Sequence, residues 1–284
     1  MKFVSFFNLL SVAVSIVPVQ VRPTRSRVPI LEASFDILDY DIRFECPVVI
    51  STSCSSGNVL EKTFVVHGDS LLPIETARID KEGLAATGWV TVGDLSFAAV
   101  LTRNICPGGV TTVCIGPSSD LSLENSKFGL TRDGLIPESR FVHEDLEYVP
   151  AVGSRNGWAF VTKFVQFGHQ RIHDMEIAIN TDQTSPIAMS DKTLGLLFGE
   201  EVRESLLLPG RFFKIASRKK TPLLIRNLQF ELNLTLGEGG LWVDVITDPK
   251  DSRYNQIGLG YDLIENLDIY LDSENSRIGL RASV

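Results

Sequence analysis

Two polar stretches that follow short apolar runs hold the side chains best placed to do chemistry. Ser51 follows the apolar run 47–50, and Thr181 and Asp182 follow the run 177–179. An apolar run that ends in a polar turn is typical of a buried strand that presents the next side chains at its end. A serine hydroxyl becomes a hydrolytic nucleophile only beside a histidine and an acid, and the sequence has no GxSxG elbow. The sequence therefore gives no support for a serine hydrolase.

Metal binding is the second chemistry to consider. His169 and His173 have the spacing of zinc ligands on a helix, but the residues around them indicate a hairpin turn. We therefore expect a structural or solvent-exposed role for both histidines. The cysteines fit no CxxC pattern, and we expect neither a metal nor another cofactor.

The amino-terminal residues 1–20 are expected to be a secretory signal. Lys2 precedes an apolar run that is short for a membrane span, and Ala13 and Ser15 suit a small-residue cleavage site. We therefore expect a secreted, extracellular protein that has no membrane anchor once the signal is removed. Asn233, in Asn-Leu-Thr, is an expected glycosylation site.

The chain has four cysteines, an even number that agrees with secretion and allows three pairings. Cys46 and Cys54 have the same spacing as Cys106 and Cys114. This spacing favours two local disulfides, each of which would stabilise the fold by about 2–3 kcal/mol.

Composition places the chain among ordinary globular proteins. It has 284 residues, 44% of them hydrophobic, and a formal net charge of -8. That is enough material for one large domain or two smaller ones, and the acidity argues against nucleic acid as a partner. The basic stretch 22–27 reads as a disordered terminus or a processing site.

Short strand-like runs alternate with turn residues along the chain, which predicts an all-β protein. The stretches 34–44 and 158–167 each have the alternation of a strand, and 176–190 reads as two strands joined by a polar turn. The glycines of 153–157 mark the best linker. We therefore expect one lobe over 28–152 and a second over 153–284.

Several of these stretches resemble the motifs of pepsin-like aspartic peptidases. The first active-site loop of that family reads apolar–apolar–Asp–Thr–Gly, and Ser51 and Ser53 stand here in place of its Asp and Gly. When the second loop is aligned on Thr184 and Ser185, Thr181 replaces the aspartate and Gln183 the glycine. The flap motif of the family is matched by His67, Gly68 and Asp69, with the histidine in place of tyrosine.

The longest match to this family lies near the carboxyl terminus, in the stretch LGYDLIENLDIYLDSENSRIGL. It agrees in register with the family pattern at Gly260, Asn266, Asp272, Asn275, Arg277, Ile278 and Gly279. The residues alone indicate the same structure, a strand over 267–271, a turn and a return strand.

The resemblance implies a bilobal, pepsin-like β fold with a cleft between the lobes. It also implies that the site lacks the shared carboxylate pair, since Ser51 and Thr181 cannot deprotonate water. We expect a monomeric, non-catalytic homologue that binds a peptide, protein or glycan in the cleft or at its rim. The alternative is an active aspartic endopeptidase with an atypical dyad, in which Asp182 replaces the missing carboxylate.

Overall fold

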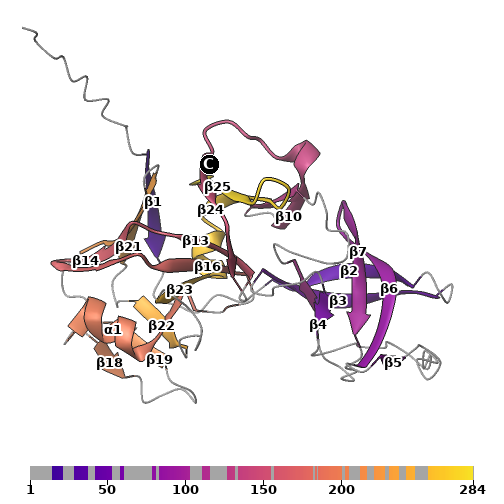
Figure 1. Cartoon of the computed structure of the whole chain (residues 1–284), viewed down its shortest axis with the longest axis horizontal. Helices are drawn as coiled ribbons and strands as arrows, with labels where there is room; N and C mark the ends of the chain where they lie inside the picture. The colour runs from indigo at the N-terminus through magenta and orange to yellow at the C-terminus, as the bar shows by residue number, and fades with distance from the viewer. Residues whose placement is uncertain are drawn as a thin grey trace, which may run out of the picture.

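The structure of the protein is a computed structural model, and its fold is almost entirely β-sheet, as the sequence predicts (Figure 1). The structure describes residues 15–21, 29–37, 42–52, 58–60, 79–80, 83–102, 111–115, 127–131, 134–154, 157–181, 183, 185–199, 202–204, 212–215, 221–227, 230–236, 241–246 and 255–283. In this part of the chain the helices are short, and none has the length and hydropathy to cross a membrane.

A seven-stranded sheet is built from residues early in the chain. Its strands pair in the order β2 (Leu31–Ile37), β3 (Ile42–Ser51), β8 (Thr111–Cys114), β4 (Asn58–Leu60), β7 (Leu95–Thr102), β6 (Gly83–Val92) and β5 (Ile79–Asp80). β2 also pairs with β6, so the sheet closes on itself. The stretch 34–44, predicted to be one strand, is divided between β2 and β3, which pair antiparallel.

An eight-stranded sheet is built from the later residues. Its order is β12 (Val152–Ser154), β13 (Gly157–Val161), β16 (Glu176–Asn180), β23 (Gln256–Gly260), β17 (Ile187–Met189), β22 (Leu241–Val245), β19 (Phe212–Ile215) and β18 (Val202–Glu204). The strand, turn and strand predicted over 176–190 are confirmed as β16 and β17. The stretch predicted to be a linker includes β12, which pairs with β13.

The two sheets have the same strand order. Beyond β12, the order β13-β16-β23-β17-β22-β19-β18 repeats β2-β3-β8-β4-β7-β6-β5 position by position. The directions agree as well: β3 runs parallel to β8 and β4 to β7, as β16 does to β23 and β17 to β22, and the remaining neighbours are antiparallel. We call residues 31–137 the first repeat and residues 157–282 the second repeat.

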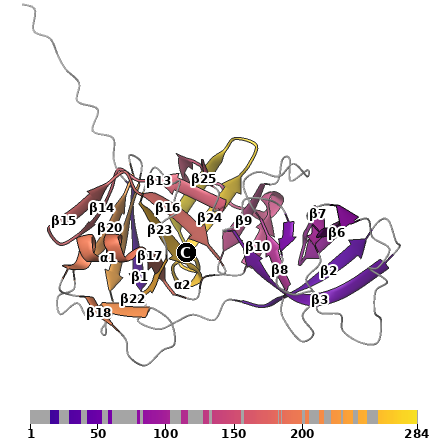
Figure 2. The same ribbon diagram turned by 60° about the horizontal axis from the view of Figure 1, so that its bottom comes forward.

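A five-stranded sheet joins the repeats, which lie toward opposite ends of the molecule (Figure 2). The first repeat supplies the hairpin of β9 (Lys127–Thr131) and β10 (Gly134–Pro137), and the second supplies that of β24 (Leu267–Asp272) and β25 (Arg277–Ala282). β9 and β24 pair antiparallel at the centre, and β11 (Glu147–Pro150) completes the sheet beside β25. The return hairpin predicted near the carboxyl terminus is thus confirmed.

A second five-stranded sheet combines β1 with four strands of the second repeat. Its order is β1 (Ser15–Val21), β21 (Phe230–Leu236), β20 (Leu223–Arg226), β14 (Phe164–Phe167) and β15 (Gln170–His173). The stretch 158–167, predicted to be one strand, is divided between β13 and β14, which belong to different sheets. The helices are α1 (Asp191–Phe198), α2 (Tyr261–Ile264) and the 3-10 turn η2 (Glu138–Arg140).

Candidate functional site

The site is built where β3 and β16, the corresponding strands of the two repeats, end. β3 ends at Ser51, which pairs with Cys114 of the parallel strand β8. β16 ends at Asn180, which pairs with Gly260 of the parallel strand β23. Because the two strand pairs occupy the same place in the two sheets, Ser51 and Asn180 are equivalent positions.

The next residue in each repeat is a threonine, and the two threonines bond to each other reciprocally. The Thr52 N–H donates to Thr181 Oγ1 at 3.1 Å, and the Thr181 N–H donates to Thr52 Oγ1 at 3.2 Å. The Thr52 hydroxyl donates to Ile179 O at 2.5 Å, and the Thr181 hydroxyl to Ile50 O at 2.6 Å. Each hydroxyl thus donates its single proton and accepts one N–H, so both threonines are fully paired although they are buried.

This exchange of hydrogen bonds corrects the register expected for the second loop. Thr181 is the counterpart of Thr52, so the residue equivalent to Ser51 is Asn180 and not Thr181. By the same order Asp182 corresponds to Ser53, although Asp182 itself lies outside the described residues. The sequence alignment on Thr184 and Ser185 placed the loop one residue too late.

The equivalent pair consists of two neutral side chains. Ser51 has only 1% of its surface exposed, and Asn180 is half-buried. Neither a serine hydroxyl nor an asparagine amide ionises at acidic pH, so the pair cannot hold or share a catalytic proton. The pair can donate and accept hydrogen bonds.

A chain of hydrogen bonds fixes the orientation of the Asn180 amide. Gln183 Nε2 donates to Ser185 O at 2.9 Å, which leaves Gln183 Oε1 to accept from Asn180 Nδ2 at 3.1 Å. The carbonyl of Ser185 can only accept, so the direction of both amides follows from it. Asn180 Oδ1 is then a buried acceptor that has no hydrogen-bond partner in the described part of the chain. Such a group gains from a hydrogen-bond donor, and because it is buried a donor from a ligand reaches it only when the loop after β16 moves.

Two glycines of β23 allow this loop to fold over the strand. A Cβ on Gly260 would lie 1.8 Å from Ser185 O, and a Cβ on Gly258 would lie 2.6 Å from Asn180 Nδ2. The equivalent positions of β8 in the first repeat are Cys114 and Thr112, according to the pairing of Ser51 and Val49. The second loop therefore lies closer to its neighbouring strand than side chains at these positions would permit.

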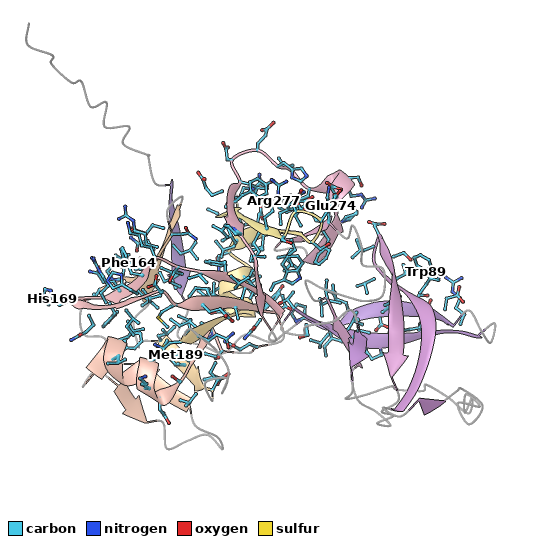
Figure 3. All side chains as sticks on the ribbon, viewed as in Figure 1. Trp89, Phe164, His169, Met189, Glu274 and Arg277 are labelled. Atoms are coloured by element: carbon cyan, nitrogen blue, oxygen red, sulfur yellow. The ribbon has the colours of Figure 1, made fainter. Side chains whose placement is uncertain are left out.

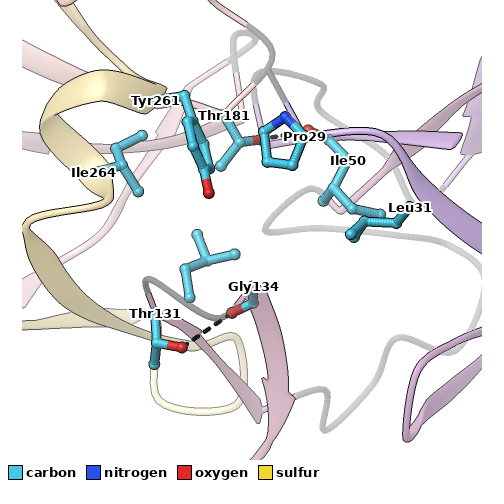
Figure 4. A pocket seen from close by; sticks show the side chains of 9 residues that line it. Pro29, Leu31, Ile50, Thr131, Gly134, Thr181, Tyr261 and Ile264 are labelled. Carbon is cyan, nitrogen blue, oxygen red and sulfur yellow. Dashed lines mark hydrogen bonds between the residues drawn. The ribbon is translucent and has the colours of Figure 1, made fainter. Parts of the chain in front are cut away.

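A small pocket lies beside the threonine pair (Figure 4). Its wall is mostly apolar and comes from both repeats and from the sheet between them: Pro29, Leu31, Ile50, Leu130, Thr131, Gly134, Thr181, Tyr261 and Ile264. The pocket suits an apolar group rather than an ion, because burying a charge against such a wall is costly.

A second polar cluster closes the turn between β24 and β25. The Asn275 N–H and Nδ2 both donate to the Asp272 carboxylate, at 3.1 and 2.8 Å, and Arg277 Nε donates to it at 2.8 Å. Burial acts to raise the pKa of Asp272, but the bonds from Asn275 and Arg277 outweigh it and lower the pKa below 3.8. Tyr270, on the same strand, donates to Glu138 Oε1 at 2.9 Å, and burial together with this bond raises its pKa. The hydrogen bonds named here all join residues of the protein to one another, and they stabilise the turn.

The remaining predicted site residues lie apart from Ser51 and Asn180 or outside the described residues. Outside them fall the flap residues His67, Gly68 and Asp69, the cysteines Cys54 and Cys106, and the side chains of Cys46 and Cys114, so the disulfides stay predictions. His169 lies in the β14–β15 turn and His173 on β15, at the outer end of the second repeat (Figure 3). Asn233 is half-buried in the middle of β21, and Thr235 of the same sequon is exposed.

Sequence reasoning missed three residues that build the site. Thr52 and Asn180 stand beside Ser51 and Thr181, and the available signal was the pattern apolar–Ile–polar–Thr that 49–52 and 178–181 have in common. Trp158 is fully buried and bonds across the repeats: its N–H donates to Thr52 O at 3.0 Å and its Nε1 to Ile115 O at 2.9 Å. Nothing local to Trp158 indicates these distant partners.

Compared with known proteins, the sequence matches no family model, and no curated protein is significantly similar to it. The resemblance to pepsin-like peptidases therefore stays a prediction from the sequence motifs.

Proposed function

We propose that this protein is a secreted, non-catalytic homologue of pepsin-like aspartic peptidases that binds a peptide where its two repeats meet. The observation that carries the proposal is the reciprocal bonding of Thr52 and Thr181 at the ends of equivalent strands. It supports a bilobal relation between the repeats, and it supports the view that Ser51 and Asn180 are the counterparts of the two aspartates of that family.

The chemistry of this pair supports binding without hydrolysis. Peptide hydrolysis by two aspartates needs one ionised carboxylate as base and one protonated carboxyl as acid, and removing either costs about 10²–10⁴-fold in rate. Ser51 and Asn180 supply neither group. In chain order Asp182 corresponds to Ser53, which gives no support to the alternative in which Asp182 acts as the base.

The neighbouring groups favour a peptide as the ligand. Asn180 Oδ1 is an acceptor that a peptide N–H or a hydroxyl would satisfy, and the pocket beside Thr181 suits an apolar side chain. A chain that alternates apolar side chains with N–H groups offers both at once.

The proposal is tested with pepstatin, an apolar peptide that carries a hydroxyl group, and with an unfolded protein as substrate. We expect the purified protein to bind pepstatin in calorimetry and to leave the substrate intact from pH 3 to pH 7. Asn180→Leu removes the acceptor at similar size and should weaken binding by roughly tenfold. Gln170→Leu, at an exposed position of β15, is the matched control and should not change it.

Each other outcome counts against the proposal in a different way. Cleavage that pepstatin inhibits would show an active aspartic peptidase. Binding that Asn180→Leu leaves unchanged would move the ligand away from this pair, and the absence of both binding and cleavage would contradict a peptide site.

A further inference from the structure

The amino-terminal strand β1 belongs to a sheet whose other strands all come from the second repeat. It runs parallel to β21 along its whole length, from Ser15 opposite Phe230 to Val21 opposite Leu236 (Figure 1). The next strand along the chain, β2, lies in the first repeat. β1 therefore attaches the start of the chain to the half of the molecule that is distant in sequence.

Without β1, β21 would be the edge of its sheet, since β20 is its neighbour on the other side. Leu232 and Leu234 of β21 are fully buried, so the open edge would lie beside the core of the sheet. An open, apolar edge strand invites pairing with another chain, and proteins usually cover such edges.

The register suits this segment to the edge. Val17 stands opposite Leu232 and Val19 opposite Leu234, so a β-branched residue lies opposite each of these two buried leucines. Pro18 stands opposite Asn233 on the outermost strand, where a missing N–H is tolerated. β1 also contacts β25 and α2, which extends its contacts to the sheet between the repeats.

We propose that the outer edge of β21 is a strand-binding site whose occupant is the chain's own Ser15–Val21. This segment then belongs to the mature folded protein, and any leader is removed before Ser15. Cleavage after residue 20, as the apolar amino terminus first indicates, would delete the strand except for Val21. The inference does not depend on peptide binding between the repeats.

Two truncations test the proposal. Deletion of residues 1–14 should leave the midpoint of thermal unfolding where it is in the full chain. Deletion of residues 1–21 should lower the midpoint by roughly 10 °C, because a domain of this size loses about 2–4 °C per kcal/mol. Equal midpoints for the two truncated proteins would overturn the proposal.

A peptide added in trans tests the edge as a binding site. A fluorescently labelled peptide of sequence SIVPVQV should bind the protein that lacks residues 1–21 with a stoichiometry of one and should restore the midpoint. The control is the peptide VVSPQIV, which keeps the composition but places serine and glutamine where Val17 and Val19 face Leu232 and Leu234. A specific strand site would be contradicted if the two peptides bound equally well or if neither peptide bound.

A cross-link in the full chain covers the case in which the longer truncation does not fold. The pair Pro18→Cys and Asn233→Cys joins directly opposed positions, which are within reach of a disulfide. Peptide mapping without reduction should find this bond, and should not find it when Pro18→Cys is combined with Thr235→Cys. Its absence from the opposed pair would show that β1 does not occupy this edge in solution.

Discussion

The two repeats use one pairing scheme but divide it differently among strands. In the first repeat β2 pairs with both β3 and β6, and β6 with β7, through strands of up to 10 residues. In the second repeat the same set of pairings is shared between two sheets, because β14 pairs with β15 and β20, and β20 with β21. Each long strand of the first repeat thus corresponds to two shorter ones in the second.

The break between β13 and β14 shows how the chain changes sheets. The Thr162 N–H donates to Met175 O at 2.8 Å, next to β16, and the Lys163 N–H donates to Arg226 O at 2.8 Å, in β20. Successive N–H groups therefore bond to different sheets, and no backbone donor is lost at the break. The two repeats share the order of strand pairing, whereas they differ in strand length and in the side chains of their loops.

We expect the largest loss of stability when the glycines of β23, which have side-chain-bearing counterparts in β8, are substituted. Gly260→Ala places a Cβ against the backbone of Ser185, which cannot move away without the loop, and should destabilise the protein by roughly 4 kcal/mol or more. Gly258→Ala is the control, because its Cβ meets the ends of the Asn180 and Gln183 side chains and should cost about 1–3 kcal/mol. Denaturant unfolding measures both, and equal losses would mean that the loop adapts freely.

The threonine pair tests how equivalent the repeats are. Thr52→Val and Thr181→Val each leave a buried carbonyl and a buried N–H of the other repeat without a partner, so each should cost about 2–4 kcal/mol. The double variant should lose less than the sum, since both hydroxyls belong to one network. Thr52→Ser and Thr181→Ser keep the hydroxyl and are the matched controls. A large loss of stability from one valine variant and none from the other would show that Thr52 and Thr181 are not equivalent.

The turn after β24 carries a carboxylate network that should make part of the stability of the second repeat depend on pH. Asp272→Asn should cost about 2–3 kcal/mol near neutral pH, because it weakens charged bonds to a buried group. The folded protein holds the pKa of Asp272 below 3.8, so its contribution is complete above that pH and is lost as the pH falls through the lowered pKa. The gap between wild type and variant in unfolding experiments should therefore close in acid. A gap that stays constant down to pH 2 would contradict this assignment.

The smallest expected change of stability tests whether Asn180 or Thr181 is the counterpart of Ser51. Ser51→Asp with Asn180→Asp puts two carboxylates at equivalent positions, where repulsion and burial raise at least one pKa. A raised pKa means that the folded state stays protonated to a higher pH than the unfolded state does. Stability should therefore fall by about 1–2 kcal/mol as the pH rises from the ordinary pKa of an aspartate through the raised one. Ser51→Asp with Thr181→Asp is the control, and it should lose stability at every pH because it also breaks the threonine pair. A pH-independent stability of the first variant would place the two side chains far apart.

Much of the architecture is determined by local sequence. Strand alternation and turn residues predict an all-β chain, and the stretch 176–190 becomes strand, turn and strand as its pattern indicates. The turn at 273–276 is also local, because Asp272 bonds to Asn275 and Arg277, which follow it closely in the chain. Such features form wherever their own few residues lie together.

The register of the site was decided only by the tertiary structure. An alignment can shift INTDQTS by one residue at no visible cost, because several of its residues are small or polar. The correct position follows from hydrogen bonds between Thr52 and Thr181, which are separated by 129 residues. The position of β1 is of the same kind, since the edge that it covers is formed by residues 230–236, far along the chain. A hydrogen bond between distant segments depends on how the sheets pack, and neither segment carries a signal of its partner.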